Sequence, residues 1–300
     1  MHGRYRQVSA GLVRLTAAAR QVGLQVNPAK CELVACGGAA ASVDLAFFPN
    51  GMPFNQSGAF SLLGAPIGDA GFCNEFTAAE RVNKALPLLE ELAVLCDAQT
   101  TLLLRRQCAS YSRMVYSTRV TPPMGLAPAL QSFDTAVRGC LEAGCSGPLT
   151  PEAWMQASLS TRSGGLGLRS VARHSVAGYA ASLLATAPLC KDIDGNYDAD
   201  QGAAVHQVNL ALPPADHFPV PAPHPPRQQE LSRALDRVVI AQLAAPGPGR
   251  EAYRAHFQLL QQEGRGLAPR FSKRCPGPPC GHSPLPNHGP LAASLAYCRF

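Results

Sequence analysis

Apolar residues recur every three or four positions along most of the first 190 residues, and this spacing predicts helices. The first helix is expected over about residues 3–22, where Val8, Leu12 and Leu15 share one stripe. It ends at Gly23, a residue type that favours a left-handed cap. Further helices are expected from residue 74 to 95, where Pro87 kinks the helix or delays its start, and over residues 98–116, 128–143, 151–159 and 170–187. Residues 230–260 regain helical periodicity, with a proline–glycine break at residues 246–249.

Three short apolar runs between residues 31 and 63 predict strands instead of helices. The runs cover residues 31–36, 43–48 and 60–63, and glycine or proline follows each of them closely. The expected fold class is therefore α+β and mostly α, with a small antiparallel strand region followed by helices.

The chain loses its periodicity in two places. Residues 213–226 hold seven prolines, which is typical of a stiff linker, and the end of the chain is rich in proline and glycine. We expect a strand-containing part over residues 1–72, a helical part over 73–190, a loop and proline-rich linker over 191–229, a helical segment over 230–262, and a disordered tail over 263–300.

Composition narrows the class of protein. The net charge of +6 permits a nucleic-acid partner without requiring one. The eleven cysteines are odd in number and irregularly spaced, and no secretory signal precedes them, which favours reduced thiols in an intracellular protein. No run approaches the ~20 apolar residues of a membrane span, so we expect a soluble chain without a membrane partner; nucleus or cytoplasm stays open.

Three sequence motifs occur in a fixed order. Residues 23–30 read Gly-Leu-Gln-Val-Asn-Pro-Ala-Lys, residues 60–68 read Phe-Ser-Leu-Leu-Gly-Ala-Pro-Ile-Gly, and residues 164–170 read Gly-Gly-Leu-Gly-Leu-Arg-Ser. The first two resemble the fourth and fifth palm motifs of reverse transcriptases from non-LTR retrotransposons and group II introns. The third resembles a segment that follows the palm in retrotransposon-like polyproteins, although Leu159-Ser160 stands where Leu-Pro is common.

The resemblance covers roughly residues 1–190 and implies the end of a palm followed by a thumb-like helical region. It assigns the palm-motif positions to Gly23, Leu24, Asn27, Leu63 and Gly64. The family polymerises with two Mg²⁺ ions held by aspartates of a Tyr-x-Asp-Asp turn. The first aspartate here is Asp44, and no Asp-Asp pair occurs. We therefore expect a fragment that needs a missing upstream palm and fingers, has no metal site or cofactor of its own, and is inactive alone.

Lys30 ends the first palm-like motif. The resemblance implies that this lysine lies near the triphosphate and acts as a general acid toward the leaving pyrophosphate, provided that the palm is complete. A solvated turn lysine is the alternative.

Four arginines follow in the helical region, namely Arg105, Arg106, Arg113 and Arg119, with no acidic residue between Asp97 and Asp134. Arg106 and Arg113 are seven apart and are expected on one helix face. The resemblance implies that these arginines contact the phosphates of an RNA/DNA template–primer. An ordinary solvated basic face is the alternative.

Two metal-like patterns are weaker. Residues 192–200 place aspartates like a calcium loop, but Tyr197 replaces the required glycine and Ala203 the required glutamate. Cys275, Cys280 and His282 have zinc-like spacing in a segment without apolar residues to fold around a metal.

The expected function is that of a piece of an RNA-directed DNA polymerase with template–primer binding. The alternative is a non-catalytic helical scaffold or interaction protein derived from such an element.

Overall fold

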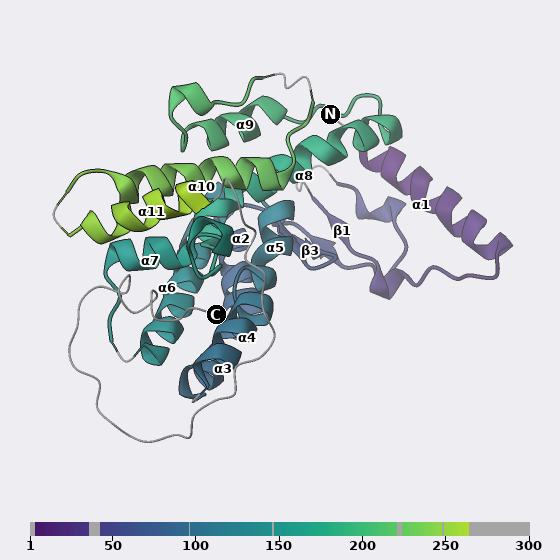
Figure 1. Ribbon diagram of the computed structural model, residues 1–300. Helices are drawn as coiled ribbons and strands as arrows, with labels where there is room; N and C mark the ends of the chain where they lie inside the picture. The colour runs from purple at the N-terminus through teal and green to yellow at the C-terminus, as the bar shows by residue number, and fades with distance from the viewer. Residues whose placement is uncertain are drawn as a thin grey trace. The chain divides into compact units, whose positions relative to one another are not determined.

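The computed structural model describes residues 4–35, 43–95, 97–145, 147–220, 224–247 and 249–263. The chain divides into two compact units, Met1–Phe76 and Thr77–Phe300. Helices dominate and the strands are few and short (Figure 1), so the expected α+β class with mostly helix is confirmed at this level. No helix in the described ranges is both long and apolar enough to cross a bilayer.

The first unit combines one long helix with two small strand pairs. Its elements are α1 (Arg4–Gln21), β1 (Leu33–Val34), β2 (Phe54–Asn55), β3 (Phe60–Leu62), β4 (Ala65–Ile67) and α2 (Ala70–Thr77). The predicted strand at residues 60–63 is confirmed, and β3 pairs with β4 in antiparallel register. The other pair, β1 with β2, is parallel, so the expectation of a wholly antiparallel region is wrong.

The predicted strand at residues 43–48 is also wrong. This segment forms the 3₁₀ turn Leu45–Phe47, because the side chain of Asp44 accepts a hydrogen bond from the Ala46 amide at 3.0 Å. A short aspartate offers the backbone a local partner that competes with strand pairing. The predicted strand at residues 31–36 shortens to β1, and residues 36–42 lie outside the described part of the chain.

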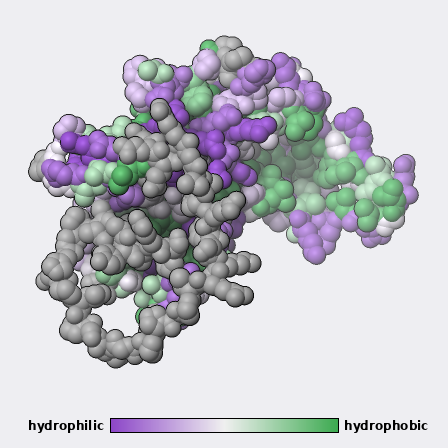
Figure 2. Space-filling view, in the orientation of Figure 1, coloured by the Kyte–Doolittle hydropathy of each residue, from purple (hydrophilic) through white to green (hydrophobic). Residues whose placement is uncertain are grey.

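Much of the apolar surface of α1 faces solvent. Val8, Val13 and Leu15 are 55 %, 66 % and 60 % exposed. The space-filling view shows hydrophobic residues gathered on the surface of this helix (Figure 2). The predicted helix is therefore confirmed, but Val8 and Leu15 of its predicted apolar stripe are not buried in a core.

The second unit is a helical assembly. Its helices are α3 (Asn83–Val94), α4 (Ala98–Leu104), α5 (Tyr111–Val120), α6 (Ala127–Gly144), α7 (Pro151–Ser158), α8 (Val171–Ile193), α9 (Gln201–Asn209), α10 (Gln228–Ala244) and α11 (Glu251–Glu263). Two π-helical turns, Ala78–Val82 and Arg105–Ala109, precede α3 and α5. The π turn before α3 leads into a helix that holds Pro87.

Helix α8 is the central element of this unit. Its small residues Ala177 and Ala180 are fully buried against Val208 of α9 and Leu231 of α10. Helices α10 and α11 run side by side (Figure 1) and bury Leu243 and Tyr253. Close packing of this kind fixes where each surface helix lies.

Helix α5 approaches α8 at a glycine. A Cβ added to Gly178 would come within 3.1 Å of Thr118 Oγ1, so a larger side chain would push α5 outward. Thr118 is itself fully buried. The position of α5 on the second unit is therefore set by this contact.

One helix was not expected. Helix α9 lies in the range predicted as loop and linker, and it begins where Asp200 accepts a hydrogen bond from the Ala203 amide at 2.7 Å. Its apolar residues Ala204, Val205 and Val208 are buried. The predicted tail lies outside the described residues after Glu263, and with it Cys275, Cys280 and His282.

Candidate nucleic-acid interface

The predicted helix over residues 98–116 is two helices with different phases. Between α4 and α5 the backbone passes through the π turn Arg105–Ala109 and then breaks at Ser110, whose φ and ψ are −110° and −127°. Arg106 and Arg113 therefore do not share one helix face, contrary to the prediction. No proline or glycine marks this break, so the apolar spacing alone gave no sign of it.

Arg105 lies inside the second unit. It is 3 % exposed, and its Nε contacts Cys140 Sγ at 3.0 Å while Nη2 donates to the Leu92 carbonyl at 3.3 Å. Its guanidinium also packs on Gly144, where an added Cβ would lie 2.9 Å from Nη2. A buried guanidinium cannot reach a nucleic-acid phosphate, so the predicted role of Arg105 is wrong and the side chain ties α3 to α6.

Arg106 is half-buried against the glycine segment. A Cβ on Gly167 would come within 2.6 Å of Arg106 Cδ, and Gly167 has a φ of +77°. The glycine thus leaves room for the aliphatic stem of the arginine, which joins the π turn before α5 to the segment after α7.

Arg113 and Arg119 are exposed on α5, as the phosphate-contact prediction requires. Arg113 Nε donates to the Cys108 carbonyl at 2.9 Å. Arg119 donates through Nε and Nη2 to Oε1 of Gln228, at 3.1 and 2.7 Å. Each contact engages one edge of the guanidinium, which orients the side chain without burying its charge.

Tyr116 lies between these arginines and was missed by the sequence reasoning. It is three residues from each, so all three side chains project from one side of α5. Tyr116 is 41 % exposed, and the Arg81 guanidinium lies 5.7 Å from its ring centroid. We call Arg113, Tyr116 and Arg119 the α5 face; the three-residue spacing around the tyrosine was the available signal.

Polar contacts with α10 hold the α5 face in place. Gln228, which holds Arg119, also donates to the Tyr111 hydroxyl at 2.9 Å. The Arg169 guanidinium lies 5.6 Å from the Tyr111 ring centroid. Burial raises the pKa of Tyr111, and the nearby Arg169 charge opposes this rise. The tyrosine therefore keeps its proton and links α5 to α10.

His174 and Asp236 continue these polar contacts into the core. His174 is 1 % exposed, and its Nε2 lies 3.2 Å from Asp236 Oδ1. Burial lowers the pKa of His174, and contact with Asp236 opposes the shift. Burial dominates, so the ring is neutral in the folded chain.

The glycine segment after α7 has a structural role that its sequence explains. The amides of Leu166 and Leu168 both donate to the Ala157 carbonyl, at 3.1 and 3.3 Å, which closes the carboxyl end of α7. A Cβ on Gly165 would lie 2.3 Å from the Leu159 carbonyl oxygen, so only glycine fits there. Because these backbone amides already donate to the Ala157 carbonyl, the segment does not form a phosphate-binding loop.

Asp134 anchors the next turn. It accepts hydrogen bonds from the Ser170 hydroxyl at 2.6 Å and from the amides of Val171 and Ala172 at 2.8 and 3.1 Å. A carboxylate at this place satisfies the first amides of α8 and complements the helix dipole. Ser170, the last residue of the third motif, is therefore fixed to α6.

In the first unit, the residues of the first palm-like motif form a helix end followed by a tight turn. Gly23 has a φ of +78° and ends α1, with the Leu24 amide donating to the Ala19 carbonyl at 2.9 Å. The Asn27 side chain accepts from the Ala29 amide and starts the 3₁₀ turn Pro28–Lys30. Lys30 is exposed at the end of this turn.

Leu63 and Gly64 form the two-residue turn between β3 and β4. Both have left-handed backbones, with φ of +51° and +78°. This conformation suits a right-twisted hairpin, but leucine rarely adopts it. Leu63 is also 90 % exposed. The tip of the β3–β4 hairpin thus carries an apolar side chain in a strained conformation.

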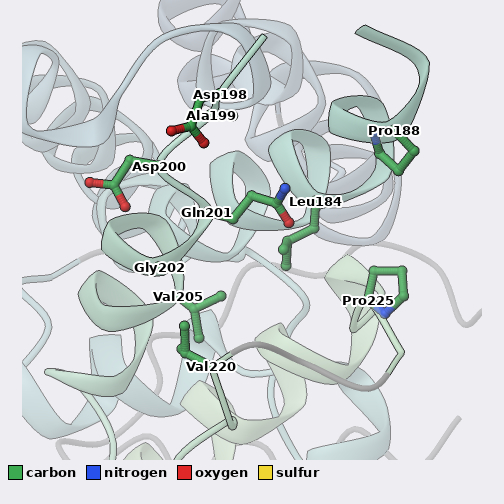
Figure 3. Close-up of a pocket in the computed structure, with 10 residues that line it drawn as sticks. All are labelled: Leu184, Pro188, Asp198, Ala199, Asp200, Gln201, Gly202, Val205, Val220 and Pro225. Carbon is green, nitrogen blue, oxygen red and sulfur yellow. The ribbon is translucent and has the colours of Figure 1, made fainter. Parts of the chain in front are cut away.

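A cavity of about 590 Å³ lies elsewhere in the second unit, between the carboxyl half of α8, the start of α9 and the proline-rich segment (Figure 3). It is lined by Leu184, Pro188, Asp198, Ala199, Asp200, Gln201, Gly202, Val205, Val220 and Pro225. Two aspartates and no lysine or arginine make this cavity unsuitable for phosphate. Within the described ranges, no group of three or more His, Cys, Asp or Glu side chains is arranged to hold a metal ion.

In comparisons with known proteins, no family model, curated protein or solved structure matches the chain.

Proposed function

We propose that this chain binds nucleic acid through the phosphate contacts of the α5 face, as a non-catalytic piece of a reverse-transcriptase-like protein. The observation that carries the proposal is the exposed pair Arg113 and Arg119, each oriented by one hydrogen-bonded edge. Arginine binds phosphate through a rigid fork of donors and needs no particular base sequence.

The charge of the chain segment that contains α5 supports the same function. The sequence between Asp97 and Asp134 contains no carboxylate that would repel a phosphate backbone. Arg113 and Arg119 are six residues apart, which places them about 9 Å apart along the helix axis. Two arginines separated in this way contact different phosphates of one strand.

The polymerase chemistry of the family is not supported by the residues present. A two-metal centre needs several carboxylates converging on one place, and the sequence has no Asp-Asp pair. The side chains described do not fit two Mg²⁺ ions, and we derive no catalytic step for this chain.

The proposal is tested by the salt dependence of binding to a fluorescent primer–template duplex. Each phosphate contact contributes about 0.7 to 0.9 to the slope of log affinity against log salt. Arg113→Gln/Arg119→Gln is expected to lower that slope by about 1.4 to 1.8. The charge-matched control Lys191→Gln/Arg233→Gln, on α8 and α10, should leave the slope unchanged. Binding that is insensitive to salt, or equal losses in both double variants, would contradict the proposal.

A separate part of the proposal concerns the palm-motif residues Lys30, Leu63 and Gly64, of which Lys30 is the one with a chemical role. Lys30 is exposed, as a triphosphate contact requires, and it acts only where a complete palm surrounds it. Lys30→Ala in a longer chain that carries the palm should slow primer extension, because no general acid then protonates the leaving pyrophosphate. An unchanged extension rate would remove this role.

A second candidate function is a scaffold that binds another protein. The exposed apolar residues Val8 and Leu15 favour it, because they are seven positions apart on one face of α1 and exposed apolar surface often marks an interaction site. Val8→Ser/Leu15→Ser would abolish such an association and leave nucleic-acid binding intact.

A further inference from the structure

The α5 face contains an aromatic ring that phosphate contact alone does not use. Tyr116 is 41 % exposed although tyrosine has a large apolar ring, and it lies between two arginines. Val120, one turn further along α5, is 38 % exposed, and Met124 beyond the helix is 76 % exposed. Basic and apolar side chains thus alternate over a short distance.

This alternation distinguishes two forms of nucleic acid. In a duplex the base faces are stacked on one another and only phosphates, sugars and groove edges are accessible. In a single strand, a base can leave its neighbours and stack on an aromatic ring, while the arginines contact the phosphates on either side. An exposed tyrosine between arginines adds affinity only in the second case.

The Arg81 guanidinium makes a cation–π contact with the Tyr116 ring. It lies 5.7 Å from the Tyr116 centroid, within the range of a cation–π contact, and it brings a further positive charge to the same place. Arg81 is held on the π turn Ala78–Val82 and Tyr116 on α5, so two elements of the second unit contribute to one platform.

We propose that the α5 face binds single-stranded RNA or DNA in preference to duplex, with an unpaired base stacked on Tyr116 and the flanking phosphates held by Arg113 and Arg119. The inference rests on the proposed nucleic-acid binding and names its substrate class. The acidic cavity of the second unit takes no part in it, because Asp198 and Asp200 repel phosphate.

The test measures binding of the full chain to a fluorescent single strand and to a blunt duplex of the same sequence, long enough that its ends are a small fraction of the sites. The single strand should bind more tightly. Tyr116→Ala should weaken single-strand binding about tenfold or more and barely change duplex binding, whereas Tyr116→Phe should retain it because the ring remains. The salt slope should stay the same in both variants.

A matched control removes an exposed apolar side chain elsewhere. Leu189 on α8 is 62 % exposed, and Leu189→Ala should change neither affinity. A second measurement does not depend on loss of binding. Trp154 is the single tryptophan, so Trp154→Phe/Tyr116→Trp carries its only indole on the α5 face, and the single strand should quench its fluorescence.

The possible outcomes separate the two proposals. Equal or tighter duplex binding, or an unchanged Tyr116→Ala affinity, with salt dependence retained, would overturn the single-strand inference and leave nucleic-acid binding in place. No salt-dependent binding to either form would overturn both.

Discussion

Leu63 has a left-handed backbone conformation, with a φ of +51°, that a leucine side chain disfavours. A left-handed conformation costs an ordinary residue about 1–2 kcal/mol, and such strain persists mainly where it serves a function. At the tip of the β3–β4 hairpin, the strain places an apolar side chain in solvent, 90 % exposed.

We therefore expect Leu63→Asn to stabilise the first unit by about 0.5–1 kcal/mol, because asparagine tolerates the left-handed region and Asn-Gly is the favoured pair for this turn. Urea unfolding followed by far-UV circular dichroism measures the change. Leu63→Val, which adds β-branching at the same φ, should destabilise the unit. Equal stability of all three chains would show that the turn relaxes without strain.

His174 makes folding depend on pH. The unfolded chain binds a proton on this ring near pH 6.5, whereas burial keeps the ring neutral to lower pH in the folded chain, where Asp236, Arg169 and Arg173 face it. Its contribution to stability is complete above pH 6.5 and is lost as the pH falls from 6.5 toward the lowered pKa. The steepest loss is about 1.4 kcal/mol per pH unit.

His174→Gln should flatten this part of the stability profile, measured by urea midpoints between pH 7.5 and about 5. His206 on α9 is exposed, so His206→Gln should leave the slope unchanged. An identical slope in the wild type and in His174→Gln would assign the pH dependence to other groups.

Among the elements, the segment after α7 shows how tightly one glycine is required. A Cβ on Gly165 would meet the carbonyl oxygens of Leu159 and Gln156 at 2.3 and 2.5 Å, and backbone atoms cannot move aside as a flexible side chain can. Gly165→Ala should destabilise the second unit by about 2–4 kcal/mol.

The matched control is Gly139, an exposed glycine within α6 that has nothing within 4 Å of an added Cβ. Gly139→Ala should stabilise the same unit by about 0.5–1 kcal/mol, because alanine is the better helix former. Thermal unfolding of the two variants gives opposite shifts. A loss of less than about 1 kcal/mol for Gly165→Ala would mean that the segment rearranges.

Helices with clear boundary residues were predictable from the sequence. The Thr150 side chain caps α7 before Pro151, and the Ser170 side chain caps α8, so both starts were visible in the chain. The break at Ser110 was not, since a π turn changes helix phase without a proline or glycine. Helix α9 was not predicted because it follows a run of aspartates typical of a loop, and the last of them, Asp200, caps the helix.

The site was predictable only in part, for a related reason. Arginines at helical spacing look alike in a sequence, and only packing distinguishes buried Arg105 from exposed Arg113 and Arg119. Gln228, which orients Arg119, lies 109 residues further along the chain. A partner at that separation has no local sequence signal.

For the whole molecule, the two units differ in how much apolar surface they bury. Among the residues that the structure describes, the second unit has several buried apolar clusters, whereas α1 of the first unit leaves Val8, Val13 and Leu15 exposed. Since burial of apolar area is the main stabilising contribution, the first unit should unfold at lower denaturant.

The single tryptophan allows this to be measured. Trp154 packs against a core cluster of the second unit, so its fluorescence reports that unit alone. Far-UV circular dichroism reports helices of both units. We expect dichroism to begin falling at lower urea than the fluorescence does. Coincident curves would indicate one cooperative transition and contradict the prediction.

The contact between Arg119 and Gln228 has a consequence for the order of synthesis. A ribosome releases α5 more than a hundred residues before α10, and closing so long a loop is entropically slow. Until α10 docks, Arg119 and Tyr111 lack the glutamine that joins them. A nascent or truncated chain without α10 thus displays Arg119 without its orienting partner, whereas Arg113 keeps its local contact with the Cys108 carbonyl. The long-range contact makes an ordered α5 face a property of the finished chain.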